Sequence, residues 1–448
     1  MHHKIRHYTI REYGHIAPGD FEREEDGILR IKEQDYNNLE DFVLRNSGDA
    51  VSEGSEFFSL THKKGVGRCL QAKNYVGVIQ TDSGLVIEIL PKIHREERGE
   101  EGNVPDTRRL FLRMLRTVRD SPFKQFNESD IATYRMHIME IFIRLFIKEM
   151  NELVRQGIRS GYVTMEENSK FLKGKLRIND HIKKNMVHKE RFFIEYDDFI
   201  RDRPENRLIK STLSLLLKSS GSNDNLKRLR ELVFIFDDVC ESSDIKGDFT
   251  RCVNNRLMKH YDTVLKWCRV FLQGESFTNW KGNGRVNAIL FPMNEVFESY
   301  VTSVLRQSGI FDEFKAQSRD KYLAEENGKG IFQLIPDITA SAGDTFYIMD
   351  AKWKLINGSD RVNKYGVSQS DMYQLLSYAK IYGKDHPDIK MALIYPANEN
   401  FNEPISFKYN DAAGILLTLW PFDIDRSVKE SGYCRDWTVN SMRIQGSP

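Results

Sequence analysis

The sequence lacks the features that mark several large classes of protein. Its five cysteines are scattered over 448 residues without a C-x-x-C pair, which excludes a zinc knuckle and a disulfide framework. No apolar run reaches the roughly 20 residues of a membrane helix, and the residues after Met1 lead into no apolar signal segment. We therefore expect a cytoplasmic protein that makes no membrane contact.

An excess of charge of one sign is also missing. The 66 basic and 65 acidic side chains give a net charge of +1, so no global field would attract the chain to DNA. The sequence contains no G-x-x-x-x-G-K-[ST] loop for phosphates, no H-E-x-x-H zinc pattern and no G-x-S-x-G nucleophile elbow. A function on DNA would therefore need a local site or a partner protein.

The hydrophobic pattern changes twice along the chain and predicts three regions. Residues 1–100 alternate as strands do, with a hairpin predicted between Tyr75 and Leu90, whereas residues 101–279 have mainly helical spacing. A boundary is expected near 275–290, and the region 280–448 follows it. Its predicted elements are a helix at 294–307, strands at 331–340 and 345–354, a helix at 369–382 and a strand at 391–395. This order predicts an α/β fold class for the region.

The candidate chemistry lies on the two adjacent strands of that region. Asp350 and Lys352 share one face of a strand because side chains alternate. If the turn is centred on residues 341–344, Asp337 pairs with Ile348 and lies diagonally across from Asp350 on the same face. Two carboxylates, a backbone carbonyl and a substrate phosphate are sufficient ligands for Mg²⁺. The lysine could ease hydroxide formation or stabilise charge on phosphorus.

An alternative interpretation is structural: Asp337 could be a turn residue after Pro336, and Asp350 with Lys352 an exposed strand pair. Burial favours the metal site. Both carboxylates stand at the ends of apolar strands, where an unpaired charge would be costly and a bound cation would offset that cost.

Two flanking helices add polar side chains to this pattern. Glu298 interrupts a helix that otherwise packs and could complete the metal site, a place that Glu295 could also take. Gln374 and Tyr378 are four residues apart and therefore share a helix face, from which they could orient the lysine or the DNA backbone. They could equally form the polar rim of an amphipathic helix.

With these residues the chain resembles the PD-(D/E)xK nuclease superfamily, in its RecB-like branch, and more closely the McrC family of McrBC-type modification-dependent restriction systems. Further McrC-like stretches are Asn74–Ile79, Ile87–Ile93, Asp202–Lys210 and Phe291–Asn294. The resemblance implies a C-terminal PD-(D/E)xK endonuclease domain behind an N-terminal β-rich and helical region. It also implies that Asp337, Asp350 and Lys352 are the catalytic triad of a magnesium-dependent nuclease that cleaves double-stranded DNA.

The same resemblance implies a partner, a hexameric McrB-like AAA+ GTPase that reads modified cytosine, with residues 1–100 as the docking region. In the segment Asp202–Lys210, Arg203 or Arg207 could contact this partner or influence its nucleotide hydrolysis. The alternative for these arginines is capping and surface charge at a helix start marked by Pro204. Two other functions stay open: a stand-alone RecB-like defence or repair nuclease, and a non-catalytic adaptor that stimulates a partner GTPase.

Overall fold

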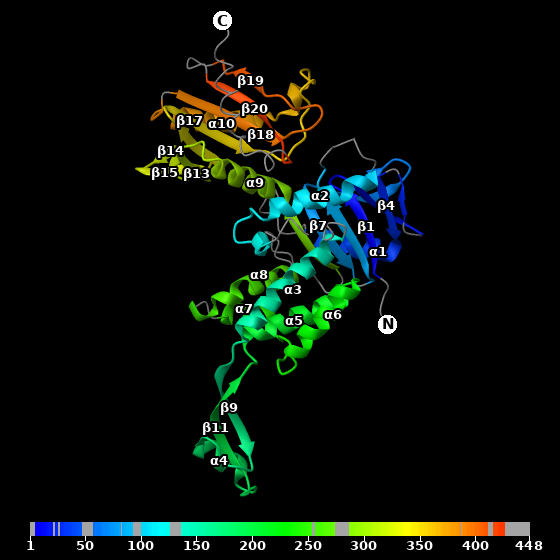
Figure 1. Ribbon diagram of the computed structural model, residues 1–448, viewed down its shortest axis with the longest axis vertical. Helices are drawn as coiled ribbons and strands as arrows, with labels where there is room; N and C mark the ends of the chain where they lie inside the picture. Colours follow the sequence, from blue (N-terminus) through cyan, green and yellow to red (C-terminus); the bar gives the residue numbers. More distant parts are fainter. Residues whose placement is uncertain are drawn as a thin grey trace. The chain divides into compact units, whose positions relative to one another are not determined.

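The computed structural model describes residues 5–20, 23–25, 27–46, 57–81, 83–92, 100–125, 136–252, 256–273, 286–386, 388–410 and 415–425 (Figure 1). The chain forms two compact units, each discontinuous in sequence. The first comprises Met1–Arg6, Gln80–Val86 and His137–Ile289, and the second comprises His7–Ile79, Ile87–Met136 and Leu290–Pro448. The three regions expected from the sequence, 1–100, 101–279 and 280–448, stay a prediction. Most of the boundary expected near 275–290 lies outside the described residues.

A six-stranded mixed sheet forms the carboxy-terminal part of the second unit. Its strand order is β13-β16-β17-β18-β20-β19. The bounds are β13 (Glu313–Ala316), β16 (Ile338–Ala342), β17 (Thr345–Ala351), β18 (Asp388–Pro396), β19 (Ile405–Lys408) and β20 (Leu416–Phe422). Helix α9 (Met293–Gln307) precedes this sheet, and a short 3-10 helix, η4 (Lys364–Gly366), and α10 (Gln369–Tyr382) connect β17 to the parallel strand β18. The α/β class expected for this region is confirmed.

The core of this part lies between the sheet and α10. Phe346 and Ile348 of β17 and Leu393 of β18 are buried in one cluster with Leu375 and Tyr378 of α10. Phe346, Ile348 and Asp350 alternate along β17 and therefore share a face. The apolar packing of this face thus continues up to the carboxylate of Asp350.

The strand expected at 331–340 is instead two strands. β15 (Lys329–Leu334) pairs with β14 (Lys321–Glu326) in a separate two-stranded sheet, and β16 begins at Ile338. Pro336 lies between them and has no N–H for a sheet ladder, so the chain can change sheets there. The change of direction places Asp337 immediately before β16.

The amino-terminal part of the second unit is β-rich, as expected. A five-stranded sheet has the order β3-β4-β2-β6-β5. Its strands are β2 (His15–Gly19), β3 (Arg23–Glu25), β4 (Ile28–Lys32), β5 (Phe58–Lys63) and β6 (Gly67–Ala72), and α1 (Glu33–Asn46) contacts β2 and β4. Helix α2 (Glu100–Leu115), followed by the 3-10 helix η1 (Pro122–Gln125), contacts α9.

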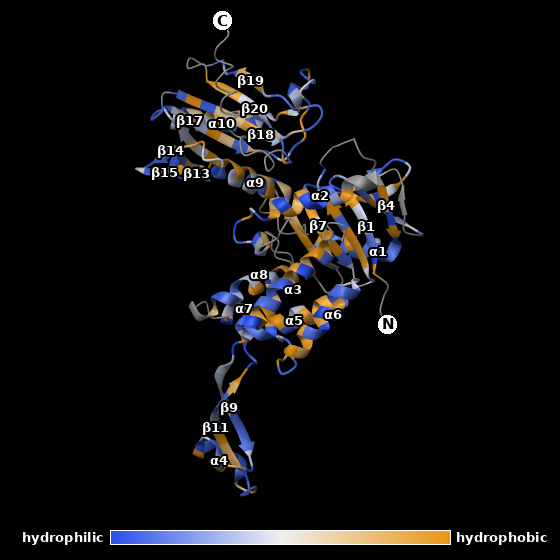
Figure 2. Cartoon of the chain, in the orientation of Figure 1, coloured by the Kyte–Doolittle hydropathy of each residue, from blue (hydrophilic) through white to orange (hydrophobic). Residues whose placement is uncertain are grey.

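The predicted hairpin is present as β7 (Tyr75–Thr81) and β8 (Leu85–Leu90). It belongs to a four-stranded sheet of order β1-β8-β7-β12, with β1 (Arg6–Arg11) and β12 (Val286–Pro292) at the edges. Every residue of β7 and β8 is buried, and Figure 2 shows much of this sheet in the hydrophobic colour. The hairpin is a central element of the fold.

Helices and one projecting arm make up the first unit. The helices are α3 (Ile138–Gln156), α5 (Pro204–Ser219), α6 (Asn223–Ile235), α7 (Ile245–Arg251), η3 (Arg256–Tyr261) and α8 (Asp262–Gln273). The arm consists of β9 (Gly161–Ser169), β10 (Lys175–Leu176), α4 (Ile178–Asn185) and β11 (Phe192–Ile200), and it extends away from these helices (Figure 1). Over the described part of the chain, no helix combines the length and the apolar character that crossing a membrane requires.

Candidate active site

The hairpin of β16 and β17 brings the two aspartates of the predicted triad together. Ile338 pairs with Met349 in this antiparallel ladder, so one residue further along Asp337 stands opposite Asp350. The expected pairing of Asp337 with Ile348 is therefore wrong by two residues. An offset of two keeps every side chain on its predicted face, and the shared face of the two carboxylates survives the correction.

The register differs because the turn is tighter than expected. Ala342 pairs with Thr345, which leaves only Gly343 and Asp344 between the strands. Gly343 has φ of +57°, a left-handed conformation that glycine adopts without strain and that two-residue hairpin turns require. The short turn moves the two aspartates from a diagonal to a directly opposed position.

Asp350 forms an ion pair with Lys352. Asp350 Oδ2 lies 2.6 Å from Lys352 Nζ, and the two side chains are 2% and 30% exposed. Burial raises the pKa of Asp350 despite the lysine charge and hydrogen bond, which lower it. Burial alone would lower the pKa of Lys352, but the charge and hydrogen bond of Asp350 raise it overall. The lysine is therefore an ammonium at neutral pH, and its charge lies at the border between core and solvent.

Asp337 is held through both its side chain and its backbone. Its Oδ2 accepts a hydrogen bond of 2.8 Å from the amide of Ala351, and its carbonyl accepts one of 2.8 Å from the amide of Gln317. Burial raises the pKa of Asp337 well above its usual range, and the charges of Asp350 and Glu298 raise it further. Three carboxylates thus repel one another where water is largely excluded.

Glu298 reaches this group from α9. Its Oε1 accepts a hydrogen bond of 2.9 Å from Gln317 Nε2, while burial and the charge of Asp350 raise its pKa. Gln317 follows β13 with φ of +46°, and it connects Glu298 to the backbone of Asp337. Sequence reasoning did not find Gln317, because a lone glutamine after a short strand gives no pattern to recognise.

The predicted pair on α10 is joined by a hydrogen bond. Gln374 Nε2 donates to Tyr378 Oη at 2.8 Å, and Tyr378 Oη donates to the carbonyl of Ile335 at 3.2 Å. The tyrosine thus fastens α10 to the segment just before Asp337. Asp371, one turn earlier on α10, contributes to the raised pKa of Asp350, after burial. Sequence reasoning missed Asp371, since an acidic residue in a first helical turn is ordinary capping.

The donor set suits a hard divalent cation. Asp337 and Asp350 are opposed carboxylates whose raised pKa values reflect burial and repulsion, both of which a cation would relieve. In the described ranges, no three side chains of His, Cys, Asp or Glu are grouped so as to hold a metal together. A cation would therefore use the two aspartates with backbone, water and substrate oxygens, and Glu298 would approach it beside Gln317.

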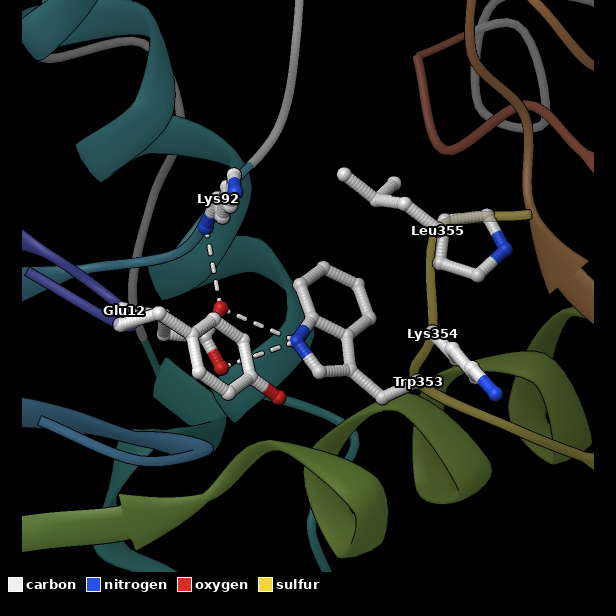
Figure 3. Close-up of a pocket in the computed structure, with 7 residues that line it drawn as sticks. Glu12, Lys92, Trp353, Lys354 and Leu355 are labelled. Carbon is white, nitrogen blue, oxygen red and sulfur yellow. Dashed lines mark hydrogen bonds between the residues drawn. The ribbon is translucent and has the colours of Figure 1, made fainter. Parts of the chain in front are cut away.

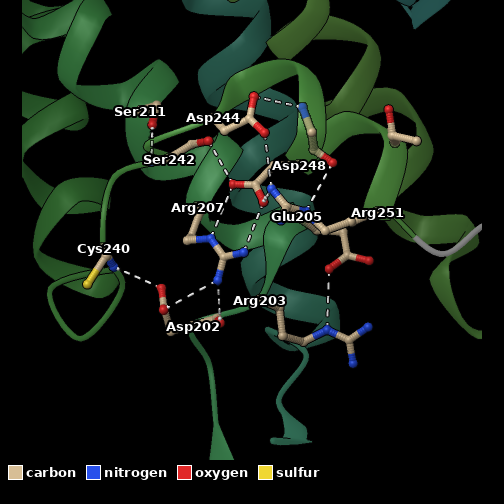
Figure 4. A network of polar contacts seen from close by, with 12 residues as sticks. Asp202, Arg203, Glu205, Arg207, Ser211, Cys240, Ser242, Asp244, Asp248 and Arg251 are labelled. Atoms are coloured by element: carbon tan, nitrogen blue, oxygen red, sulfur yellow. Dashed lines mark hydrogen bonds and ion pairs between the residues drawn. The ribbon is translucent and has the colours of Figure 1, made fainter.

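The two arginines predicted to bind a partner lie at the start of α5, in a polar network (Figure 4). Arg207 donates to both carboxylate oxygens of Asp248, at 2.9 and 3.2 Å, and at 3.0 Å to the carbonyl of Asp202. Asp248 is buried, so this pair fixes α5 to α7. Arg203 Nε donates to Glu205 Oε2 at 3.3 Å, and the figure shows the far end of its guanidinium directed away from Glu205.

The arm carries many large apolar side chains that are exposed to solvent. Those more than half exposed are Tyr162, Phe171, Leu172, Ile178, Ile182, Met186, Val187 and Phe199. Figure 2 shows hydrophobic colour along parts of α4 and β11. Exposed apolar patches of this kind mark interaction surfaces in soluble proteins. The sequence pattern places this region in a mainly helical stretch, and its apolar residues give no signal of a binding role.

Comparison with known proteins agrees with the resemblance seen in the sequence. Residues 70–396 match the family model described as McrBC 5-methylcytosine restriction system component. The chain is 21% identical over 271 residues to the type IV methyl-directed restriction enzyme EcoKMcrBC of Escherichia coli K12, covering 58% of this chain and 77% of that protein.

A solved structure extends the likeness in fold to almost the whole chain. It comes from an assembly of Thermococcus gammatolerans McrB AAA+ hexamers with bound McrC. The TM-score is 0.63 at 18% identity, over 94% of this chain and 96% of that chain. At this identity the comparison concerns the fold.

Proposed function

Since the chain belongs to the family of McrBC 5-methylcytosine restriction system components, we propose that it is the DNA endonuclease subunit of a GTP-dependent restriction complex directed at modified cytosine. The observation that carries this proposal is the meeting of Asp337, Asp350 and Lys352 at one end of the β16–β17 hairpin. Two carboxylates and a lysine at that position match a PD-(D/E)xK nuclease centre. The reaction is magnesium-dependent hydrolysis of a phosphodiester bond.

Each residue of the site has a distinct part in this reaction. Asp337 and Asp350 would hold Mg²⁺, with Glu298 at its edge, and the ion when bound supplies Lewis-acid charge at the scissile phosphate. Lys352 holds its proton because Asp350 raises its pKa. Its part is therefore to stabilise negative charge that develops on the phosphate oxygens, in preference to removing a proton from water.

Gln374 and Tyr378 support the metal site from α10. The hydrogen bond between them and the bond from Tyr378 to the carbonyl of Ile335 fix the backbone just before Asp337. Tyr378 also lies within the electrostatic reach of both aspartates and of Lys352. The pair would orient these groups and the DNA backbone beside them.

We place the docking of a McrB-like AAA+ GTPase hexamer on the arm. Its exposed apolar side chains need a partner surface, whereas the β7–β8 hairpin, in the region 1–100 where docking was expected, is buried throughout. Arg203 is a second candidate contact because it makes one longer hydrogen bond, to Glu205, whereas Arg207 makes two hydrogen bonds to Asp248 that join α5 to α7. Recognition of modified cytosine in double-stranded DNA would belong to the partner, since the balanced charge of this chain provides no strong field for DNA.

The proposed function is tested by cleavage of methylated double-stranded DNA with the full-length chain, a McrB-like GTPase and GTP. Asp350→Asn and Lys352→Ala should lower the cleavage rate at least about 100-fold, as expected when a group that stabilises the transition state is removed. Asp344→Asn, on the exposed turn of the same hairpin, is the matched control and should cut normally.

Two results would contradict the proposal. Cleavage at the wild-type rate by Asp350→Asn or Lys352→Ala would refute the assignment of the active site. Cleavage that persists with the metal chelated would remove the role of magnesium. A chain that stimulates GTP turnover but never cuts DNA would instead identify the non-catalytic adaptor.

A further inference from the structure

We propose that Glu12 is a positioning residue for the nuclease centre, which it reaches through the indole of Trp353. This inference rests on the proposed nuclease function, and it adds a residue that lies 340 positions before the proposed catalytic lysine, Lys352. The contact makes the amino-terminal β region part of the catalytic apparatus.

The contact joins a buried carboxylate to a buried indole (Figure 3). Trp353 Nε1 donates to Glu12 Oε1 at 3.1 Å and to Glu12 Oε2 at 3.0 Å. Glu12 is 2% exposed and Trp353 is 8% exposed. Because the indole nitrogen is shared between the two oxygens of one carboxyl group, the ring is held in both position and orientation.

Glu12 is itself fixed on the amino-terminal side. Its Oε2 accepts a hydrogen bond of 2.9 Å from the backbone amide of Lys92, and its own amide donates to the carbonyl of Leu90 at 2.9 Å. Both partners lie at the end of β8, a strand buried along its whole length. The carboxylate therefore presents a rigid anchor to the indole.

Trp353 transmits this anchor to the active site because it directly follows Lys352. The amide of Lys352 donates to the carbonyl of Ile394 at 2.8 Å, so the backbone is held on one side by β18 and on the other by the indole. The indole also packs on Phe297, with ring centroids 5.3 Å apart. Phe297 precedes Glu298 on α9, so one aromatic contact connects the segments that carry Lys352 and Glu298.

Burying the carboxyl group of Glu12 is energetically costly, which indicates a role beyond packing. Burial raises the pKa of Glu12 to about 7 although the hydrogen bonds from Lys92 and Trp353 favour the charged form, so a carboxylate at this position is costly. Two apolar side chains of similar volume would fill the same space without that penalty. A buried carboxyl group with directed hydrogen bonds instead gives a unique position to the residue that follows Lys352.

The test uses the full-length chain with a McrB-like GTPase, GTP and methylated DNA. Trp353→Phe keeps the ring on Phe297 and removes only the N–H donor, and Glu12→Ala removes the acceptor. Each variant should lower kcat about tenfold with KM for DNA changed less than about twofold, because the loss affects the placement of Lys352 and leaves DNA binding intact. The double variant should be no worse than either single variant. Glu313→Ala, on the exposed strand β13, is the matched control.

A second readout does not depend on cleavage. Acetylation of individual lysines, mapped by mass spectrometry on the intact chain, should label Lys352 at least about threefold faster in Trp353→Phe, since its ion pair with Asp350 loosens. Lys321, which pairs with Asp385 elsewhere, should label at an unchanged rate and serves as the reference.

The outcomes separate this inference from the function on which it rests. Unchanged labelling of Lys352, or additive losses of kcat in the double variant, would overturn the role of Glu12. A wild-type chain that never cuts DNA would overturn the nuclease function, while the labelling of Lys352 would still decide whether Glu12 positions it.

Discussion

The buried carboxyl of Glu12 gives the second unit a dependence on pH that one substitution should remove. Its pKa rises from 4.5 to about 7 because burial outweighs the hydrogen bonds from Lys92 and Trp353 and the charge of Lys92. A raised pKa means that the folded state binds the proton more tightly than the unfolded state. The resulting stabilisation is full below 4.5, declines as the pH rises and is lost above about 7.

The size of the effect follows from the shift. The rise in the pKa of Glu12 corresponds to about 3 kcal/mol between the protonated and the ionised protein. Glu12→Gln cannot ionise, but its amide replaces one of two acceptor oxygens, which costs about 1 to 3 kcal/mol at every pH. The variant should therefore be less stable than the wild type near pH 5 and about equally stable, or more stable, near pH 8.5.

Thermal unfolding of the wild type and Glu12→Gln, followed at several pH values, measures this difference. About 1 kcal/mol moves Tm by about 2 to 4 °C in a unit of this size, so the gap in Tm should close by about 6 °C or more between pH 5 and pH 8.5. Every other titrating group is common to the two proteins and cancels. Glu313→Gln, an exposed control, should follow the wild type at all pH values. A gap for Glu12→Gln that stays constant over this range would refute the reasoning.

Three further predictions follow from the other parts of the chain. Arg207→Ala should lower the stability of the first unit by about 2 kcal/mol, seen as faster hydrogen exchange in α5 and α7, because Asp248 stays buried with only Ser242 and Arg251 to compensate its charge. Arg203→Ala removes one longer bond to the buried Glu205, so it should speed exchange less than Arg207→Ala does and should alter the GTP turnover of the partner. Magnesium at about 100 times its Kd should stabilise the wild type by about 2.7 kcal/mol in thermal unfolding and should leave Asp337→Asn unaffected. Phe171→Ser combined with Val187→Ser should weaken binding of the McrB-like GTPase in a titration without lowering Tm, since both side chains are at least 80% exposed.

The sequence predicts the residues of the candidate site better than their geometry. Alternation along one strand is enough to place Asp350 and Lys352 on one face, and an apolar neighbourhood is enough to predict burial. The opposition of Asp337 and Asp350 depends on a turn of two residues, and turn length is set by the local backbone at Gly343. Pattern recognition gives the face, while the register needs the structure.

Contacts between distant segments lie outside what the sequence pattern can predict. Gln317 and Glu12 belong to no motif, and each acquires its place through a partner far along the chain, Glu298 in one case and Trp353 in the other. The same limit explains why exposed apolar residues of the arm carried no signal: a hydrophobic residue in a strand pattern predicts a core until the structure shows that nothing covers it.

Two arginines of the segment Asp202–Lys210, Arg203 and Arg207, differ in their contacts, and this difference separates the roles that the family resemblance left open to both. Both residues matched the family pattern, and both could have been surface charges. Arg207 makes two charge-assisted hydrogen bonds to a buried carboxylate, so a change there would reach the partner only by loosening α5 and α7. Arg203 makes one longer bond through Nε to Glu205, which is also buried, and Figure 4 shows the end of its guanidinium directed away from Glu205. We therefore expect a direct effect on the nucleotide of a partner from Arg203, and the larger effect on folding from Arg207.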